Sequence, residues 1–239
     1  MTIVPSSVLL LLALGAASQA GASATSVTEE PGTRDQAAQA WRAEGLQAIK
    51  VRGMDVAYAQ PGASLQAYHG ILVKPVAVSF QKNWARSAAI ATGTRLYPRH
   101  ADRIREEMAD VVDREIRREF EQGGWRVMDT AGEGVLELEV RVVDLYLNAP
   151  DLPTPGLTRS YARSFGQLSL VAVLRDAASG AVVMRLFDHV DGHDHATFVH
   201  TTRVENTREV GLVASSWTRA LRRQLPLARV PGDRSNGRP

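Results

Sequence analysis

Apolar side chains recur every fourth residue between positions 104 and 120, and this periodicity constrains the fold more than any other feature of the chain. The stripe consists of Ile104, Met108, Val112, Ile116 and Phe120, with Val111 beside it. Residues at this spacing lie on one face of an α-helix, and the other faces here carry mostly charged residues. Pro98 suits a first helical turn, and Gly123-Gly124 suits a helix end. The sequence therefore predicts one long amphipathic helix over 98–122 that buries a single face.

The clearest strand prediction follows shortly after that helix. Over 135–147, apolar residues first alternate with Glu137, Glu139 and Arg141, which predicts one buried face and one solvated face. The alternation changes phase between Val143 and Leu147, which indicates a bulge or a twist near the strand end. Residues 125–128 predict a further short strand, and 131–134 are typical of a turn.

Three more elements follow from local patterns. Residues 70–80 predict a strand that has a bulge at Pro75 or lies at a sheet edge, because proline cannot donate to a ladder. Residues 165–176 and 181–189 flank the turn 177–180 and predict an antiparallel hairpin. A last helix is expected from about Asn206, where Glu209 makes a variant of the capping box. Its stripe is Val210, Val213, Ala214, Trp217, Leu221 and Leu225, and Pro226 ends it.

This order of elements predicts an α+β fold. We expect a two-layer sandwich in which an antiparallel or mixed sheet of about four to five strands carries two amphipathic helices on one face. The domain is expected to span 69–228, after a flexible or weakly structured lead-in over 25–68 and before a disordered tail over 229–239. Within the lead-in, 36–51 is a weak helix candidate. Residues 81–96 show no clear pattern, although Trp84 is expected to pack on the domain.

The first 24 residues have the pattern of an export signal. The apolar run Val8–Leu14 is too short to span a bilayer, which takes ~20 residues. Small residues follow it, and cleavage after Ala20 or Ala24 fits the spacing that signal peptidases accept. Because no Lys or Arg precedes the run, an uncleaved anchor or a buried helix is the alternative. We expect a periplasmic or secreted protein.

The absence of cysteine from the 239 residues excludes disulfides, a thiol nucleophile, cysteine-ligated zinc and iron–sulfur clusters. It also excludes a lipid anchor on a lipobox cysteine, so the mature chain is expected to have no membrane span and to be held together by packing. The net charge of +2 is spread along the chain, which argues against a nucleic-acid partner.

Several stretches of the chain resemble one bacterial family. They are GILVKPVAVSF at 70–80, GWRVMDTAGEGVLELEVRVVDL at 124–145 and VAVLRDAASGAVVMRLFD at 171–188. The third contains a D-x-x-S/T-G turn at Asp176–Gly180, and Trp217 lies in a final helix. From 70 to 225 the chain thus resembles the bacterial family known as domain of unknown function 3313, whose members are mostly small envelope lipoproteins. The resemblance implies an envelope location and brings no catalytic residues, and the chain departs from the lipoprotein pattern by lacking the anchor cysteine.

The densest group of possible metal ligands lies in DHVDGHDHATFVH at 188–200. Its members are Asp188, His189, Asp191, His193, Asp194, His195 and His200. Imidazole and carboxylate ligands suit zinc, copper or nickel. However, the spacing matches no catalytic zinc motif such as H-E-x-x-H. A solvated hairpin exit is the main expectation, and adventitious metal binding and a dedicated metal site are the alternatives.

Other candidate sites carry weaker patterns. The G-x-S-x-G motif of a nucleophilic serine is absent around Ser164, Ser215 and Ser216. The Gly132-Glu133-Gly134 segment precedes a strand, which favours a turn over a phosphate loop. Glu137 and Glu139 share one strand face and are either an acid–base pair or simply its solvated side. Arg159, Tyr161, Arg163 and Phe165 alternate, so they form either a ligand site for an anion or sugar or a solvated strand.

Taken together, these patterns favour a non-catalytic envelope module. The expected partner is another envelope protein, which would add a strand to an exposed sheet edge. The alternatives are a metal-dependent enzyme or metal-binding protein using 188–200, and a carrier of a small ligand. The sequence predicts no catalytic residue, no cofactor and no resident metal, and it leaves the oligomeric state open.

Overall fold

The computed structural model describes residues 31–63, 65, 68–93, 95–148, 161–162, 166–192, 199–200 and 203–225. The helices are α1 (Arg34–Ala43), α2 (Trp84–Thr92), α3 (Pro98–Gln122) and α4 (Arg203–Arg222). The strands are β1 (Gln47–Ile49), β2 (Val56–Ala59), β3 (Gly70–Val73), β4 (Ala77–Phe80), β5 (Arg126–Met128), β6 (Val135–Leu147), β7 (Tyr161–Ala162), β8 (Gly166–Asp176), β9 (Val182–Asp191) and β10 (Val199–His200). Across these described residues, no helix combines the length and the apolar character needed to cross a membrane.

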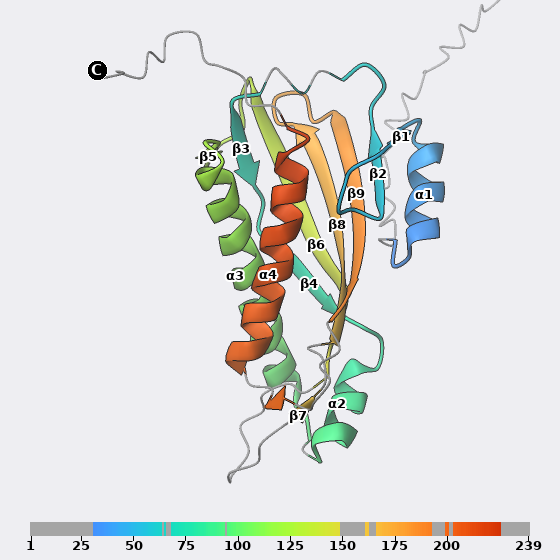
Figure 1. Ribbon diagram of the computed structural model, residues 1–239, viewed down its shortest axis with the longest axis vertical. Helices are drawn as coiled ribbons and strands as arrows, with labels where there is room; N and C mark the ends of the chain where they lie inside the picture. The colour runs from blue at the N-terminus through green and yellow to red at the C-terminus, as the bar shows by residue number, and fades with distance from the viewer. Residues whose placement is uncertain are drawn as a thin grey trace, which may run out of the picture.

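One mixed sheet organises the domain. Its eight strands follow the order β1-β2-β9-β8-β6-β3-β5, with β4 also paired to β6. The β2, β9, β8 and β6 strands are antiparallel neighbours, whereas β3 and β4 run parallel to β6, and β5 runs parallel to β3. Figure 1 shows α3 and α4 side by side along one face of the sheet, and α1 beside β2. The predicted α+β class is confirmed. The structure has more elements than the four to five strands and two helices that were expected.

The main core lies between the sheet and the α3–α4 pair. The predicted helix 98–122 matches α3 at both ends, and every residue of its apolar stripe is buried. In one cluster the stripe meets the inward residues of β6 and the buried face of α4. This burial supplies most of what holds α3 in place, because fully burying one such side chain contributes about 1.5–3 kcal/mol.

The opposite face of the sheet is covered in part, which the two-layer prediction missed. Here α1 packs through Trp41, whose ring meets Tyr58 edge-on with centroids 5.9 Å apart. Val171 and Phe187 complete this second cluster. They alternate along β8 and β9 with residues that point into the main core, so these strands are buried on both sides.

Residues 34–59 are therefore more ordered than the weakly structured lead-in that was expected. The β2 strand pairs with β9 from Val56 opposite Phe187 to Ala59 opposite Met184. A capping box starts α1, where the backbone N–H of Gln36 donates to Thr33 Oγ1 at 3.3 Å. The Thr33-x-x-Gln36 pattern is a local signal for the start of α1 that the sequence analysis did not use.

The irregularity predicted at Pro75 separates β3 from β4. Both segments pair with β6, but between Val73 and Ala77 the chain advances four residues while β6 advances three, from Leu138 to Arg141. The extra residue is a bulge, as expected where proline cannot donate to the ladder.

The phase change predicted near the end of β6 is also confirmed. Asp144 has a left-handed φ of 54°, and the register with β8 shifts between Val143 and Tyr146. A single residue in this conformation turns the following side chains to the other face, which explains why Leu145 and Leu147 are buried.

The predicted hairpin is formed by β8 and β9. In its turn, Asp176 Oδ1 accepts the Ser179 backbone N–H and hydroxyl, each at 2.7 Å. These two hydrogen bonds hold the pKa of Asp176 below its usual range. Gly180 closes the turn with a φ of 73°, which favours glycine. The D-x-x-S/T-G pattern is thus a structural turn motif.

The unassigned stretch 81–96 contains α2. Trp84 is 1% exposed, and its indole Nε1–H donates to the Leu147 carbonyl at 3.0 Å. Its ring stacks on Phe80 with centroids 3.9 Å apart. The expectation that Trp84 packs on the domain is therefore confirmed.

Candidate functional site

The predicted group of metal ligands is divided between the two faces of β9. Asp188 Oδ1 accepts the backbone N–H of Asp55 at 3.1 Å, and the backbone N–H of His189 donates to Asp55 Oδ2 at 3.1 Å. The His189 side chain points the other way, since successive side chains of a strand alternate. Its Nδ1 lies 2.9 Å from Ser169 Oγ, and its Nε2 lies 3.4 Å from Asp191 Oδ1. Asp188 therefore does not converge with His189 and Asp191 on one point.

The side chains of the other members of that group are outside what the structure describes. His193, Asp194 and His195 lie outside the described residues, and of His200 only the backbone in β10 is described. Among the residues with described positions, no three His, Asp or Glu side chains are placed to hold a metal ion. The metal hypothesis thus has no support from this part of the chain.

Asp188 is the strongly perturbed carboxyl group of this region. Burial raises its pKa to about 6, and the nearby Asp55 carboxylate adds to the rise. The hydrogen bond from the Asp55 backbone and the neighbouring His189 oppose it. Because the folded state retains this proton up to about pH 6 and an unfolded Asp loses it near pH 4, folding stability should fall as the pH rises through that window.

Substituting Asp188→Asn is expected to stabilise the fold at pH 7.5 by about 1–2 kcal/mol. The amide oxygen still accepts the Asp55 N–H, and no charge is buried. At pH 4 the gain should vanish because Asp188 is then protonated. Urea unfolding at both pH values measures this difference. Asp191→Asn, exposed on the same strand, is the control and should change stability little at either pH. An equal gain from Asp188→Asn at both pH values would contradict the assignment.

The Glu137–Glu139 pair and the glycine-containing segment 132–134 are both within the described residues. On the partly exposed face of β6, Glu139 Oε1 lies 2.7 Å from the Arg141 guanidinium, and Glu137 Oε2 lies 4.0 Å from Lys74 Nζ. Each carboxylate thus sits beside a cation, which favours a solvated strand face over an acid–base pair. The segment 132–134 is the turn before β6.

The other predicted residues are placed as follows. Ser216 is exposed on α4, whereas Ser215 is buried. Ser164, Arg159, Arg163 and Phe165 lie outside the described residues, and of Tyr161 only the backbone in β7 is described. The predicted anion or sugar site over 159–165 therefore stays a prediction.

A hollow of about 400 Å³ lies at the end of β6, β8 and β9. Its lining consists of Gln81, Tyr146, Asn148, Gly166, Gln167, Asp191 and Gly192. These residues supply one carboxylate and no imidazole, so this lining does not make a transition-metal site.

A groove of about 340 Å³ between α3 and α4 brings together residues that the sequence analysis did not connect. Its lining comprises Val111, Arg114, Glu115 and Arg118 of α3, with Thr207, Arg208, Gly211, Leu212 and Ser215 of α4. A Cβ at Gly211 would lie 3.5 Å from Val111 Cγ1 and 3.6 Å from Glu115 Cγ, at ordinary contact distance. A methyl group at this position would therefore fit against α3 without displacing its neighbours.

The groove combines positive charge with an apolar side chain. Arg118 pairs with Glu115. The exposed guanidinium groups of Arg114 and Arg208 form no ion pair with a carboxylate of the described residues. Leu212 is 51% exposed beside them. Three guanidinium groups against one carboxylate make the groove suited to an anionic ligand.

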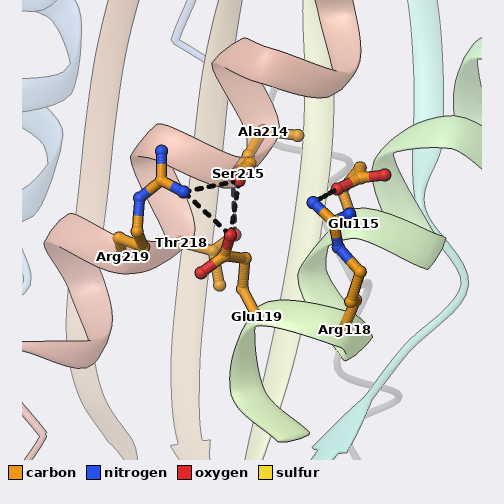
Figure 2. A network of polar contacts seen from close by, with 7 residues as sticks. All are labelled: Glu115, Arg118, Glu119, Ala214, Ser215, Thr218 and Arg219. Carbon is orange, nitrogen blue, oxygen red and sulfur yellow. Dashed lines mark hydrogen bonds and ion pairs between the residues drawn. The ribbon is translucent and has the colours of Figure 1, made fainter. Parts of the chain in front are cut away.

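Figure 2 shows the polar network that fixes α4 against α3 next to this groove. Glu119 is 3% exposed and accepts hydrogen bonds from Ser215 Oγ at 2.5 Å and Arg219 Nη1 at 3.0 Å. Arg219 Nη1 also lies 3.0 Å from Ser215 Oγ. The buried carboxylate is thus satisfied by two groups of the neighbouring helix, and Ser215 takes part in the contact between α3 and α4.

Sequence reasoning missed the groove because its arginines lie on two helices about one hundred residues apart. Each helix alone shows only charged residues on an exposed face. One local signal was present: Gly211 interrupts an otherwise helical pattern, and a glycine inside a helix lowers its stability relative to alanine.

Comparisons with known proteins show distant likenesses. No curated protein matches the chain. The PelC dodecamer from Paraburkholderia phytofirmans is 11% identical over 67% of this chain and 95% of that one, with a TM-score of 0.33. A DUF330 protein from Xanthomonas campestris is 14% identical over 68% and 86%, with a TM-score of 0.36. A DUF4136 family protein from Bacteroides thetaiotaomicron is 12% identical over 77% and 97%, with a TM-score of 0.35. All three likenesses are too distant to bear on assembly or activity.

The family comparison is more direct. One family model, that of DUF3313, matches residues 36–221, which include all of α3 and all but the terminal residues of α1 and α4. The match begins within the region expected to be a lead-in, in agreement with the order seen in α1 and β2. The chain therefore belongs to the DUF3313 family, described as proteins of unknown function.

Proposed function

We propose that this protein is an exported, non-catalytic binding module of the cell envelope whose α3–α4 groove receives a segment of a partner protein. The observation that carries this proposal is the pair of exposed guanidinium groups, Arg114 and Arg208, beside the exposed Leu212. Guanidinium groups bind carboxylates through two parallel hydrogen bonds, and an exposed leucine adds apolar contact area. The expected partner segment carries one or two acidic residues next to an apolar side chain.

The groove is a better docking surface than the sheet edges. Among the described strands of the main sheet, those with one unpaired edge are β1, β5 and β4, which have three, three and four residues. A strand added to so short an edge gains few backbone hydrogen bonds, and pockets for alternate side chains are needed for specificity. The groove offers both charge complementarity and an apolar contact. Strand addition at an edge is therefore not part of the proposal.

A non-catalytic role is supported by the partners of the candidate reactive groups. Ser215 donates to a buried carboxylate, and Glu137 and Glu139 each lie beside a cation. Export is supported by the apolar run and the small residues over 8–24. On this proposal the mature protein is recovered from the periplasm or medium with an N-terminus that follows Ala20 or Ala24.

The partner proposal is tested by crosslinking in intact cells of the native host. A photoreactive phenylalanine derivative placed at Leu212 is expected to form one defined crosslinked protein. The same crosslink should be lost when Arg114→Glu and Arg208→Glu are added, because both cations are then reversed. A photoreactive group at Gln39, exposed on α1 away from the groove, is the matched control.

The identified partner is then tested directly with a synthetic peptide that covers the crosslinked segment. We expect the peptide to bind the wild-type chain and to bind the Arg114→Glu/Arg208→Glu variant at least tenfold more weakly. A crosslink from Gln39 to the same protein, or equal peptide binding by both chains, would show that the groove is not the docking site.

A further inference from the structure

A cluster of basic residues lies at the end of the molecule where α2 meets the first turns of α3 (Figure 1). We call it the basic tip, and it consists of Lys82, Arg86, Arg95, Arg99 and Arg103, all exposed. Over 82–103 the sequence contains a single acidic residue, Asp102, and its Oδ1 is held by Arg105 at 2.6 Å. None of the five basic side chains forms an ion pair within the described part of the chain. Within the described residues, the tip thus carries a net positive charge.

Two apolar or aromatic side chains project from the same region. Ile90 is 77% exposed in the last turn of α2, one helical turn after Arg86. Tyr97 is 42% exposed, and the Cζ atoms of Arg95 and Arg99 lie 5.4 Å and 4.8 Å from its ring centroid. An isoleucine this exposed amid cations forms an amphipathic surface.

The tip is held rigidly to the domain. Trp84 anchors the first turn of α2 through its hydrogen bond to Leu147 and its stacking on Phe80. The Arg105 guanidinium of α3 lies 5.6 Å from the same Phe80 ring. Gly93 ends α2 with a left-handed φ of 64°, which turns the chain back toward α3. The basic and apolar groups are therefore presented together by fixed elements.

We propose that the basic tip docks on a membrane surface that contains anionic phospholipid. Arginine and lysine groups near such a surface are attracted to lipid phosphates, and isoleucine and tyrosine side chains enter the interfacial region. No residue of the basic tip lines the hollow at the end of β6, β8 and β9 or the α3–α4 groove. A projecting surface of this composition fits a plane of headgroups better than an acidic protein. This inference is independent of the partner proposed for the α3–α4 groove.

Vesicle binding tests the inference with the full chain. We expect it to bind phosphatidylcholine vesicles containing 30% phosphatidylglycerol and to bind pure phosphatidylcholine vesicles much more weakly. Each basic residue near the surface adds ~5-fold to the affinity, so Arg95→Glu/Arg99→Glu should reduce binding at least tenfold. Raising sodium chloride from 50 to 300 mM should also weaken binding, since the charges are exposed.

Two further variants make the outcome decisive. Arg126→Glu/Arg223→Glu makes the same charge change at exposed positions beside β5 and the end of α4, at the opposite end of the molecule, and should retain vesicle binding. Ile90→Ser retains all the cations and should weaken binding by about threefold or more through lost apolar contact. An equal loss in the Arg126/Arg223 variant, unchanged binding by Ile90→Ser, or binding to polyglutamate without binding to anionic vesicles would each overturn the proposal.

Discussion

Replacing Met108 with aspartate is expected to prevent the protein from folding. Met108 is 2% exposed, belongs to the α3 stripe and packs in the cluster that joins α3, α4 and β6. An aspartate there places a charge in an apolar core without a partner, which costs several kcal/mol. That cost is comparable with the whole stability of a typical domain, about 5–15 kcal/mol. Circular dichroism and urea unfolding of the purified variant measure the result.

The matched control for Met108→Asp lies on the same helix. Arg103→Asp introduces the same side chain at an exposed position, so the native circular dichroism spectrum and a cooperative urea transition should be retained. If Met108→Asp also unfolds cooperatively with a native spectrum, the α3 stripe does not face the core.

The second large effect on stability is expected when the Arg219 cation is removed from the network in Figure 2. Arg219→Met leaves the Glu119 carboxylate buried with Ser215 as its remaining partner. Loss of one partner of a buried ion pair typically costs 3–5 kcal/mol. Because the Arg219 side chain is 43% exposed, water can replace part of the interaction, and we expect a loss of about 2–3 kcal/mol.

A double variant separates the charge from the packing. Glu119→Leu combined with Arg219→Met removes both charges, and its stability should return to within about 1 kcal/mol of the wild type. Urea unfolding of the two single variants and the double variant gives the coupling free energy. Arg118→Met is the control because its partner Glu115 belongs to a more exposed pair, so a loss of no more than about 1 kcal/mol is expected. A double variant as unstable as Arg219→Met would show that the network does not act through its buried charge.

Local patterns predicted those elements whose burial follows a simple period. The α3 stripe and the alternation in β6 each have one buried face, so the period of the sequence equals the period of the structure. The irregularities at Pro75 and between Val143 and Leu147 could be predicted for the same reason, because each one interrupts the regular pattern of its strand. Short elements were missed: β2 has four residues, buried on three of them, and therefore shows no alternation.

The candidate site was harder to predict than the fold. The His and Asp residues over 188–192 are adjacent in sequence, but a strand places Asp188 and His189 on opposite faces. Conversely, Arg114 and Arg208 are far apart in sequence, but α3 and α4 bring both to one groove. Sequence reasoning therefore grouped His and Asp residues that the strand places on opposite faces. It did not group the two arginines that the helices bring to one groove.

By itself the sequence determined which side chains are buried along α3, α4 and β6, where the turn of the β8–β9 hairpin lies, and where the pairing of β3 and β6 is interrupted. These properties depend on hydrophobic periodicity and on the backbone limits of proline and glycine, which act within a few residues. Only the tertiary structure decided the strand order, the parallel pairing of β3 with β6, the cover of the second sheet face by α1, and the meeting of Arg114 with Arg208. Those choices are made by contacts between segments far apart in the chain, because burying both faces of β8 and β9 requires partners that no local pattern specifies.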